Sequence, residues 1–373
     1  MTADQFPVLS HGIYANHAAI SPWPRVSADA VAAFARENAE LGPTGYRSWI
    51  RRERELREKI VRLVNAPSID DIALLQNTTE GVSLVAYGYP WAKGDNVVLP
   101  AGEFPSNRLP WLAQSARGVD VREVDIRVEN PEDALLDRLD GRTQVLAVSS
   151  VQYSDGLRLD IEKLGAACEG EGVLFFVDAI QHLGALPFDV QAAGVGCLSA
   201  GAHKWLLGPE GLGVFYCREA ERERIGLRQA GWHMYDYPWH FERTDWTPSA
   251  NARRFEAGSP NSLGQVALHA SLGLLLDTGS ALIAERIRAN SHRLASGIED
   301  FPGLRVCSRM SAERVSGIVS FRSDGDGTRD LFKRLMQSGV TCAFRNGCVR
   351  LSPHFYQDDM VIDEILNRLE GCL

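Results

Sequence analysis

The sequence predicts an α/β protein in which a larger domain holds a mainly parallel sheet and a smaller α+β domain follows it. Its 373 residues exceed one ordinary domain of about 150 residues and indicate two domains. Between residues 70 and 220, short apolar runs alternate with amphipathic stretches, which is typical of a layered domain with a parallel sheet. We therefore expect the ligand site at the carboxyl ends of these strands.

Within that region, local patterns predict the individual elements. Short apolar runs predict buried strands, and they are NVVLP (96–100), VDVREV (119–124), QVLAVSSV (144–151), VLFFVD (173–178) and LGVFYC (212–217). Amphipathic stretches at 131–139 and 160–171 predict helices between these strands, and a charged helical pattern at 49–64 precedes them. Asp178 ends one of the strands and is therefore a candidate site residue.

The second half of the chain has a different character. Residues 228–262 are dense in Trp, Tyr, His, Pro and Gly without a clear period, which favours a functional or interface loop. A helical stretch near 262–300 leads into a tail where strand-like and helical segments alternate, which predicts a compact C-terminal domain. We divide the chain into an N-terminal segment (1–20), a large domain (21–265) and a small domain (266–373).

Composition and charge argue against several classes of protein. The formal net charge is -9, with acidic and basic residues mixed, so the basic footprint of a nucleic-acid or membrane-surface protein is missing. No window approaches about 18 uninterrupted apolar residues, and the N-terminus lacks a signal-peptide pattern. The seven cysteines are scattered and odd in number, which argues against a disulfide framework and a zinc site. We expect a cytoplasmic protein with a small-molecule partner and no metal.

Lys204 lies in a small, apolar and glycine-rich segment, SAGAHKWLLGPEGLG (199–213), between two expected strands. Burial lowers the pKa of a lysine and leaves a neutral amine that attacks aldehydes, as a Schiff-base lysine must. A lysine at the edge of a loop with its amine in water is the alternative. The segment alone does not separate the two.

Asp178 favours the Schiff-base interpretation. It stands 26 residues before Lys204, at the end of an expected strand. Pyridoxal 5'-phosphate (PLP) needs a carboxylate beside its pyridine nitrogen, whereas an isolated Asp after a strand is usually a helix N-cap. Gln181 follows on the same side of the next turn and is placed to donate to the phenolic oxygen of that cofactor.

The segment QNTTEG (76–81) joins an apolar run to a helical pattern. Backbone amides and threonine hydroxyls at a helix N-terminus suit a phosphate group. The alternative is a capping box between Asn77 and Glu80 without any ligand.

Together these segments resemble the class V aminotransferase family of PLP fold-type I enzymes, which includes cysteine desulfurases, kynureninases and isopenicillin N epimerase. The resemblance covers nearly the whole chain and rests on FFVDAIQ, GAHKWLLGPEGLG and NTTEG. It implies a large domain with a mainly parallel seven-stranded sheet and a small C-terminal α+β domain. It also implies PLP as the cofactor, bound by Thr78, Thr79, Asp178, Gln181, Ser199, His203 and Lys204, with Thr79 and His203 at the phosphate.

The same resemblance implies contacts outside these three motifs. Phe104, in EFPSN, lies where relatives place a residue that stacks on the PLP ring. Ser259 and Trp232 match segments that reach the phosphate of the neighbouring subunit, which implies a homodimer. Arg350, in VRLSPHFY, matches the arginine that binds the substrate carboxylate, and a guanidinium suits that group through two parallel hydrogen bonds. His17 and Ala18 match an N-terminal stretch that lies near the active site and the substrate.

The reaction follows less directly, because one fold and one cofactor support several reactions. Desulfurases need a cysteine thiolate on a mobile loop before the carboxylate-binding arginine. Here the corresponding segment, from Gly339 to Arg350, is short. Cys342 falls in a strand-like run within it, and Cys348 lies two residues before Arg350. The stacking histidine of desulfurases is replaced by the Phe104 segment, and the position that often holds asparagine carries Ser150 or Gln152.

We therefore expect a PLP enzyme that acts at Cα of an amino acid through a Lys204 Schiff base, by aminotransferase, lyase or epimerase chemistry. One alternative is a cysteine desulfurase or selenocysteine lyase that uses Cys342 or Cys348. Another is a non-catalytic binding protein with the same fold. The sequence does not identify the amino acid.

Overall fold

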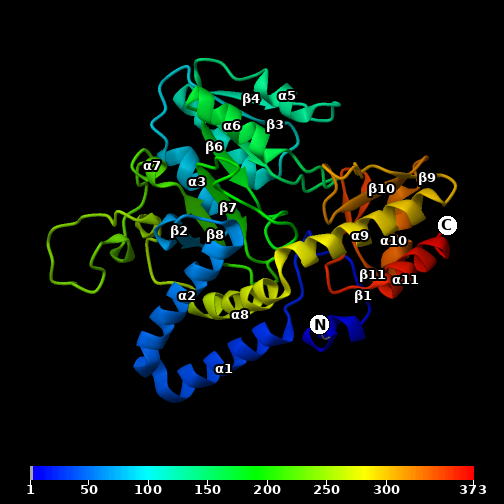
Figure 1. The fold of residues 1–373 in the computed structure, drawn as a ribbon, viewed down its shortest axis with the longest axis horizontal. Helices are drawn as coiled ribbons and strands as arrows, with labels where there is room; N and C mark the ends of the chain where they lie inside the picture. The colour runs from blue at the N-terminus through cyan, green and yellow to red at the C-terminus, as the bar shows by residue number, and fades with distance from the viewer. Residues whose placement is uncertain (1–2) are drawn as a thin grey trace.

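The computed structural model describes residues 3–373. It consists of a large α/β part and a small α+β part, each built on its own sheet (Figure 1). The large part is a seven-stranded sheet in the order β2-β8-β7-β6-β5-β3-β4. Its strands are β2 (Ile72–Leu75), β3 (Asn96–Pro100), β4 (Asp120–Val124), β5 (Thr143–Ser149), β6 (Leu174–Asp178), β7 (Cys197–Gly201) and β8 (Gly213–Cys217). β3 to β7 pair in parallel and only β8 runs antiparallel to its neighbours, which confirms the predicted mainly parallel sheet.

Helices cover the sheet because its strands are apolar on both faces. Every residue of β3, β6, β7 and β8 is buried, as expected of strands covered on both sides. The helices of this part are α3 (Thr78–Gly88), α4 (Leu109–Leu112), α5 (Pro131–Leu136), α6 (Ile161–Glu171) and α7 (Glu219–Arg222). Two hydrophobic clusters occupy the two faces of the sheet.

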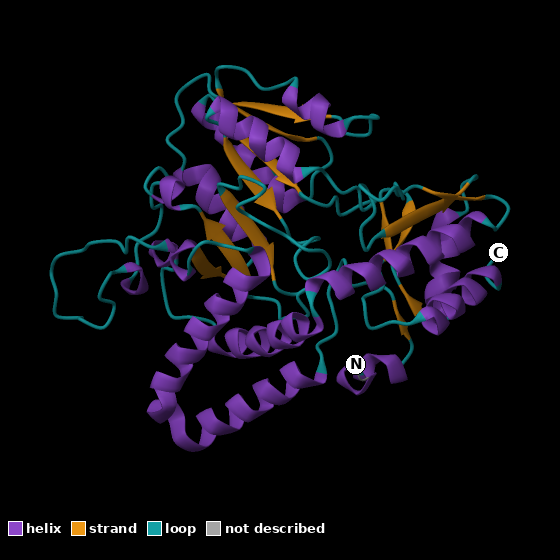
Figure 2. Ribbon diagram, in the orientation of Figure 1, coloured by secondary structure: helices purple, strands orange, loops and turns teal. Residues whose placement is uncertain are grey.

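Two long helices near the N-terminus form a hairpin beside the sheet (Figures 1 and 2). They are α1 (Arg25–Leu41) and α2 (Tyr46–Val64), and both pack against α8 (Ser262–Thr278). α8 is followed by α9 (Ser280–Glu299), and the pair bends by 84° around Gly279, whose φ of 88° is easily adopted only by glycine. The expected domain boundary at residues 265 and 266 falls inside α8.

The small part is a four-stranded antiparallel sheet in the order β12-β13-β10-β9, covered by helices on one side. It consists of β9 (Leu304–Val306), β10 (Val319–Ser323), α10 (Thr328–Gln337), β12 (Ala343–Arg345), β13 (Cys348–Leu351) and α11 (Asp359–Glu370). The N-terminal segment joins it, because β1 (Ile13–Tyr14) pairs in parallel with β11 (Val340–Thr341). This pairing brings residues 15–20 to the boundary between the two sheets.

Among the described residues no single helix is both long and apolar enough to span a membrane. Only the bent pair α8 and α9, taken together, reaches that length and apolarity.

Candidate active site

A cavity of about 300 Å³ opens at the carboxyl ends of the parallel strands, next to the small domain. Asp178 at the end of β6 and Lys204 just after β7 form its floor. The other lining residues come from the segments after β2, β3, β5, β6 and β7, from the N-terminal segment and from β12 and β13. The site therefore lies where parallel α/β sheets bind their ligands.

Asp178 and Lys204 are both buried and influence each other's charge. Asp178 accepts a hydrogen bond from the Ile180 amide (3.0 Å), and burial raises its pKa to about 6, against the opposing effect of Lys204. Burial lowers the pKa of Lys204 to about 8, although Asp178 favours the ammonium form. The Lys204 amine lies 5.5 Å from the centre of the Phe104 ring. Lys204 thus has the near-neutral pKa that a nucleophilic amine needs.

The threonine turn carries both features that the sequence left as alternatives. Asn77 accepts from the Glu80 amide (3.0 Å), while the Glu80 carboxylate accepts from the amide of Gln76 (2.6 Å), one residue before the cap, which is a variant of the capping box. At the same time Thr78 and Thr79 line the cavity, and their amides, in the first turn of α3, have no intrahelical acceptor. The box therefore fixes the turn and leaves amides for an anion.

Ser199 supports this turn from below and does not line the cavity. Its hydroxyl donates to the Thr78 carbonyl (3.2 Å), and the Thr78 hydroxyl accepts from the Gly201 amide (2.9 Å). A Cβ at Gly81 would lie 2.4 Å from the Ser199 hydroxyl oxygen, so only glycine allows α3 to approach β7 this closely. Ser199 therefore packs against the threonine turn, and its contact with the cofactor stays a prediction.

His203 and Gln181 both line the cavity, as expected. Burial and the neighbouring Lys204 lower the pKa of His203 to about 4, so its ring is neutral and offers one N–H. The Gln181 side chain accepts from the Trp205 indole N–H (2.9 Å) and donates to the Ala18 carbonyl (2.9 Å). Its second amide proton remains for a ligand.

Arg350 is a buried guanidinium without a carboxylate partner among residues 3–373. It is 1% exposed, its Nη1 donates to the Tyr153 carbonyl (2.6 Å), and its Nε has no partner. Burial, followed by the proximity of Arg345, lowers its pKa to about 10. A buried arginine that lacks an anion at a cavity wall fits the carboxylate of a ligand.

Arg345 and Tyr153 also line the cavity and were not predicted. Arg345 is exposed and makes no ion pair within the described chain. It ends β12, and the turn Asn346-Gly347, with φ values of 48° and 79°, returns the chain into β13 and Arg350. An Asn-Gly pair between two apolar runs is a strong hairpin signal, so the sequence indicates the turn that joins Arg345 to β13, but it does not show that this hairpin borders the cavity.

The N-terminal residues are divided between the cavity and the packing behind it. Ala18 lines the cavity. His17 does not, because its ring is fully buried and its two nitrogens bond to the Ser352 carbonyl (2.8 Å) and the Tyr356 hydroxyl (2.6 Å). His17 therefore anchors this segment to the small domain, and its contact with substrate stays a prediction.

Ser259 and Trp232 lie away from the cavity of their own chain. Ser259 is exposed, and Trp232 stands at the base of a loop that projects from the body, which we call the aromatic arm (residues 232–247; yellow-green in Figure 1). The arm exposes several large rings, namely Tyr237, Trp239, Phe241 and Trp246.

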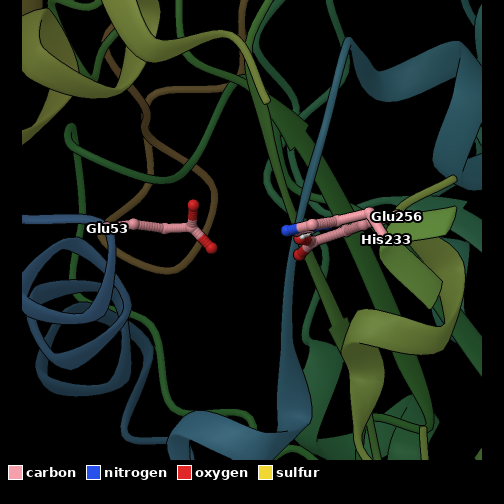
Figure 3. A group of neighbouring side chains, drawn as sticks. All are labelled: Glu53, His233 and Glu256. Carbon is pink, nitrogen blue, oxygen red and sulfur yellow. Dashed lines mark ion pairs between the residues drawn. The ribbon is translucent and has the colours of Figure 1, made fainter. Parts of the chain in front are cut away.

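A separate group of buried charges holds the base of this arm. Figure 3 shows Glu53 on α2 and the pair His233 and Glu256 directed toward one space. Arg57 binds both carboxylates there, with nitrogen–oxygen distances of 2.8 Å. The guanidinium already supplies the positive charge that a metal ion would bring, so we interpret the group as a structural ion cluster.

Cys342 and Cys348 do not line the cavity. Cys342 is buried between β11 and β12, and burial raises its pKa to about 12, which opposes formation of a thiolate. Cys348 is half-buried, and its sulfur lies 3.5 Å from that of Cys307. Neither cysteine has the exposed, low-pKa setting of a nucleophile.

The charged residues of the cavity fit PLP, because two of them are buried without an oppositely charged partner within the described chain. Asp178 and Arg350 are buried ions without an ion-pair partner among residues 3–373, and PLP with an amino-acid substrate presents the complementary groups. Lys204 would bind the aldehyde, Asp178 would face the ring nitrogen, and Thr79 and His203 would contact the phosphate.

Comparisons with known proteins agree with this fit. The model of the aminotransferase class-V family matches residues 13–361, which include the whole cavity wall. A probable cysteine desulfurase of Methanothermobacter thermautotrophicus is 29% identical over 98% of this chain and 96% of its own. The cystine C-S lyase C-DES, solved with its product cysteine persulfide, is 25% identical with a TM-score of 0.91, over 98% of this chain and 99% of its own.

A second C-DES structure, a mutant with glycine covalently linked to the PLP cofactor, has a TM-score of 0.92 at 24% identity over 99% of both chains, and it shows the shared fold. The family match confirms the resemblance inferred from the three motifs. The chain therefore belongs to the aminotransferase class-V family and is a PLP-dependent enzyme.

Proposed function

We propose that the protein cleaves the Cβ–S bond of a sulfur-containing amino acid by β-elimination, without a persulfide on a protein cysteine. The observation that carries this proposal is a cavity that combines a near-neutral lysine with two guanidinium groups and has no cysteine in its wall. The similarity to a cystine C-S lyase over 98% of this chain supports the same reaction class.

Each side chain has a defined task in this proposal. Bound PLP supplies an electron-accepting ring that stabilises negative charge at the substrate Cα. Arg350 binds the substrate carboxylate and so orients the Cα–H bond. Lys204, with a pKa of about 8, would accept the Cα proton of the bound substrate. Asp178 keeps the ring nitrogen protonated by its negative charge.

Arg345 indicates which sulfur amino acid fits. It is a second cation at the cavity wall, exposed at the rim, and makes no ion pair within the described chain. A disulfide amino acid such as L-cystine has a second carboxylate that would reach such a group. The balanced reaction is L-cystine and water to pyruvate, ammonia and cysteine persulfide. The bond electrons of Cβ–S leave with the sulfur.

The experiment supplies L-cystine or L-cysteine to the PLP-loaded enzyme and measures pyruvate, ammonia and sulfane sulfur. We expect the enzyme to form pyruvate from cystine without any added keto acid. Alanine instead of pyruvate, with dependence on a thiol acceptor, would indicate desulfuration, and dependence on a keto acid would indicate transamination. Loss of optical rotation of the supplied amino acid, without formation of pyruvate, ammonia or alanine, would indicate epimerisation.

Desulfuration is the second candidate because curated relatives are named cysteine desulfurases. The double variant Cys342→Ala/Cys348→Ala separates the two reactions. Elimination predicts activity within about twofold of wild type, since neither thiol lines the cavity. A loss of turnover with intact PLP binding would instead assign the reaction to one of these cysteines.

We also propose that the enzyme is a homodimer in which Ser259 and the aromatic arm reach the neighbouring active site. The exposure of Ser259 and of the arm's rings supports this arrangement. Light scattering should give twice the chain mass of 41.1 kDa. In addition, mixing inactive Lys204→Ala and Ser259→Trp subunits should restore partial activity if Ser259 acts in trans.

A further inference from the structure

Glu103 is a buried carboxylate beside the active site that none of the motifs accounts for. It lies in the turn after β3, directly before Phe104, and is 3% exposed. No lysine, arginine or histidine of residues 3–373 lies within ion-pair distance of it. Burial, with a further effect of nearby Asp178, raises its pKa to about 7, although bonds from Ser149 oppose the rise. A buried acid without a cation needs other compensation.

Three hydrogen bonds provide this compensation. The Oε1 atom accepts from the Ser149 amide (2.6 Å) and from the side-chain nitrogen of Gln152 (3.1 Å), and Oε2 accepts from the Ser149 hydroxyl. Ser149 is the last residue of β5, where it pairs with Asp178 of β6. Glu103 therefore ties the turn after β3 to the end of the neighbouring strand β5.

The residues next to these bonds form the aromatic side of the cavity. Phe104 follows Glu103, and Tyr153 follows Gln152, and their two rings meet edge to face at 5.2 Å. The Phe104 ring lies 5.5 Å from the Lys204 amine. The Tyr153 carbonyl accepts from Arg350 (2.6 Å). One carboxylate thus connects to both rings and, through Tyr153, to the carboxylate-binding arginine.

These contacts also show the surroundings of the position that often holds asparagine in relatives. The sequence offers Ser150 or Gln152 for this position. Neither lines the cavity, because Ser150 is fully buried and the Gln152 side chain points to Glu103.

We propose that Glu103 is a positioning residue whose three hydrogen bonds hold Phe104 and Tyr153 as the aromatic wall that faces Lys204. The role rests on the proposed binding of PLP at Lys204. The positioning role of Glu103 does not depend on whether the substrate is L-cystine or L-cysteine. A neutral side chain would be cheaper to bury, but only a carboxylate accepts from all three donors at once.

The test compares Glu103→Ala and Glu103→Gln with the exposed control Glu171→Ala. Glutamine with its oxygen in the Oε1 position keeps acceptance from the Ser149 amide and from Gln152, but it places an NH2 group opposite the Ser149 hydroxyl. For Glu103→Ala we expect a fall in kcat/KM of at least tenfold, weaker PLP binding and a shifted visible band of the bound cofactor. Glu103→Gln should show a smaller shift in the same direction at a nearly unchanged Tm.

A double-mutant cycle with Phe104→Ala tests the route of the effect. If Glu103 acts through Phe104, Glu103→Gln changes kcat/KM by less than about twofold in the Phe104→Ala background. In the wild-type background the same substitution changes kcat/KM by more than this. The inference is overturned if the Glu103 variants lower Tm but leave the visible band, PLP affinity and kcat/KM as in wild type. A wild-type protein without a lysine-bound PLP band would instead refute the cofactor assignment to Lys204.

Discussion

Replacing Lys204 with methionine is expected to stabilise the apoprotein at neutral pH, although it abolishes catalysis. The Lys204 amine is buried in the cavity floor, where its charge is poorly solvated. Methionine has a similar length and keeps the packing of the aliphatic stem, but it carries no charge. The lysine therefore has an energetic cost that only its chemistry explains.

The size of the effect follows from the pKa of Lys204. Folding lowers this pKa from 10.5 to about 8. One pKa unit corresponds to about 1.36 kcal/mol, so the buried ammonium costs about 3 kcal/mol at pH 7. Between the two pKa values the unfolded chain binds more protons than the folded chain, so this cost decreases as pH rises from 8 to 10.5. About 1 kcal/mol should remain at pH 10.

Urea unfolding of apoprotein at pH 7 and pH 10 measures this difference. The Lys204→Met variant should exceed wild type in the free energy of unfolding at pH 7 and approach it at pH 10. Lys93→Met, at an exposed position, is the control and should show little dependence on pH. A variant that is no more stable than wild type at pH 7, or a gain that does not change with pH, would refute the reasoning.

Substitutions at Arg350, Asp178 and Arg57 test the site and its support. Arg350→Met should lower kcat/KM about 10- to 150-fold at unchanged PLP content, because a charge-assisted contact is worth about 1.5–3 kcal/mol, and Arg350→Lys should fall between. Asp178→Asn should weaken PLP binding at least tenfold in an absorbance titration of apoprotein, because the ring nitrogen loses its anion. Arg57→Met should cost about 3–5 kcal/mol in urea unfolding, because it removes the arginine partner of the buried Glu256 and the partly buried Glu53. Arg54→Met, in an exposed pair on the same helix, should cost less than about 1 kcal/mol.

The local sequence was sufficient for the strands and the cofactor motifs. Runs such as VLFFV (173–177) are apolar at every position, and such runs become strands buried on both faces of a parallel sheet. Asp178 ends β6 and Lys204 follows β7, and these neighbouring strands are parallel, so their ends meet at one edge. The sequence spacing of the two residues therefore implied their proximity.

Where two roles were compatible with one segment, only the packing separated them. Ser199 and His17 stand beside cofactor and substrate residues in the sequence, yet their side chains point into the protein. In a strand, neighbouring side chains face opposite sides, so adjacency in a motif does not imply a shared surface.

The motifs around Lys204 could thus be predicted from the sequence, because residue type, glycine content and the spacing of apolar runs can be read from it directly. Arg345, Tyr153 and Glu103 reached the site only through tertiary structure. Arg345 comes from a hairpin of the small domain, and Tyr153 and Glu103 come from turns on adjacent strands, β5 and β3. Their contacts join segments as far as 197 residues apart, as in the bond from Arg350 to Tyr153. Such contacts depend on how the two domains pack, and no local pattern encodes that arrangement.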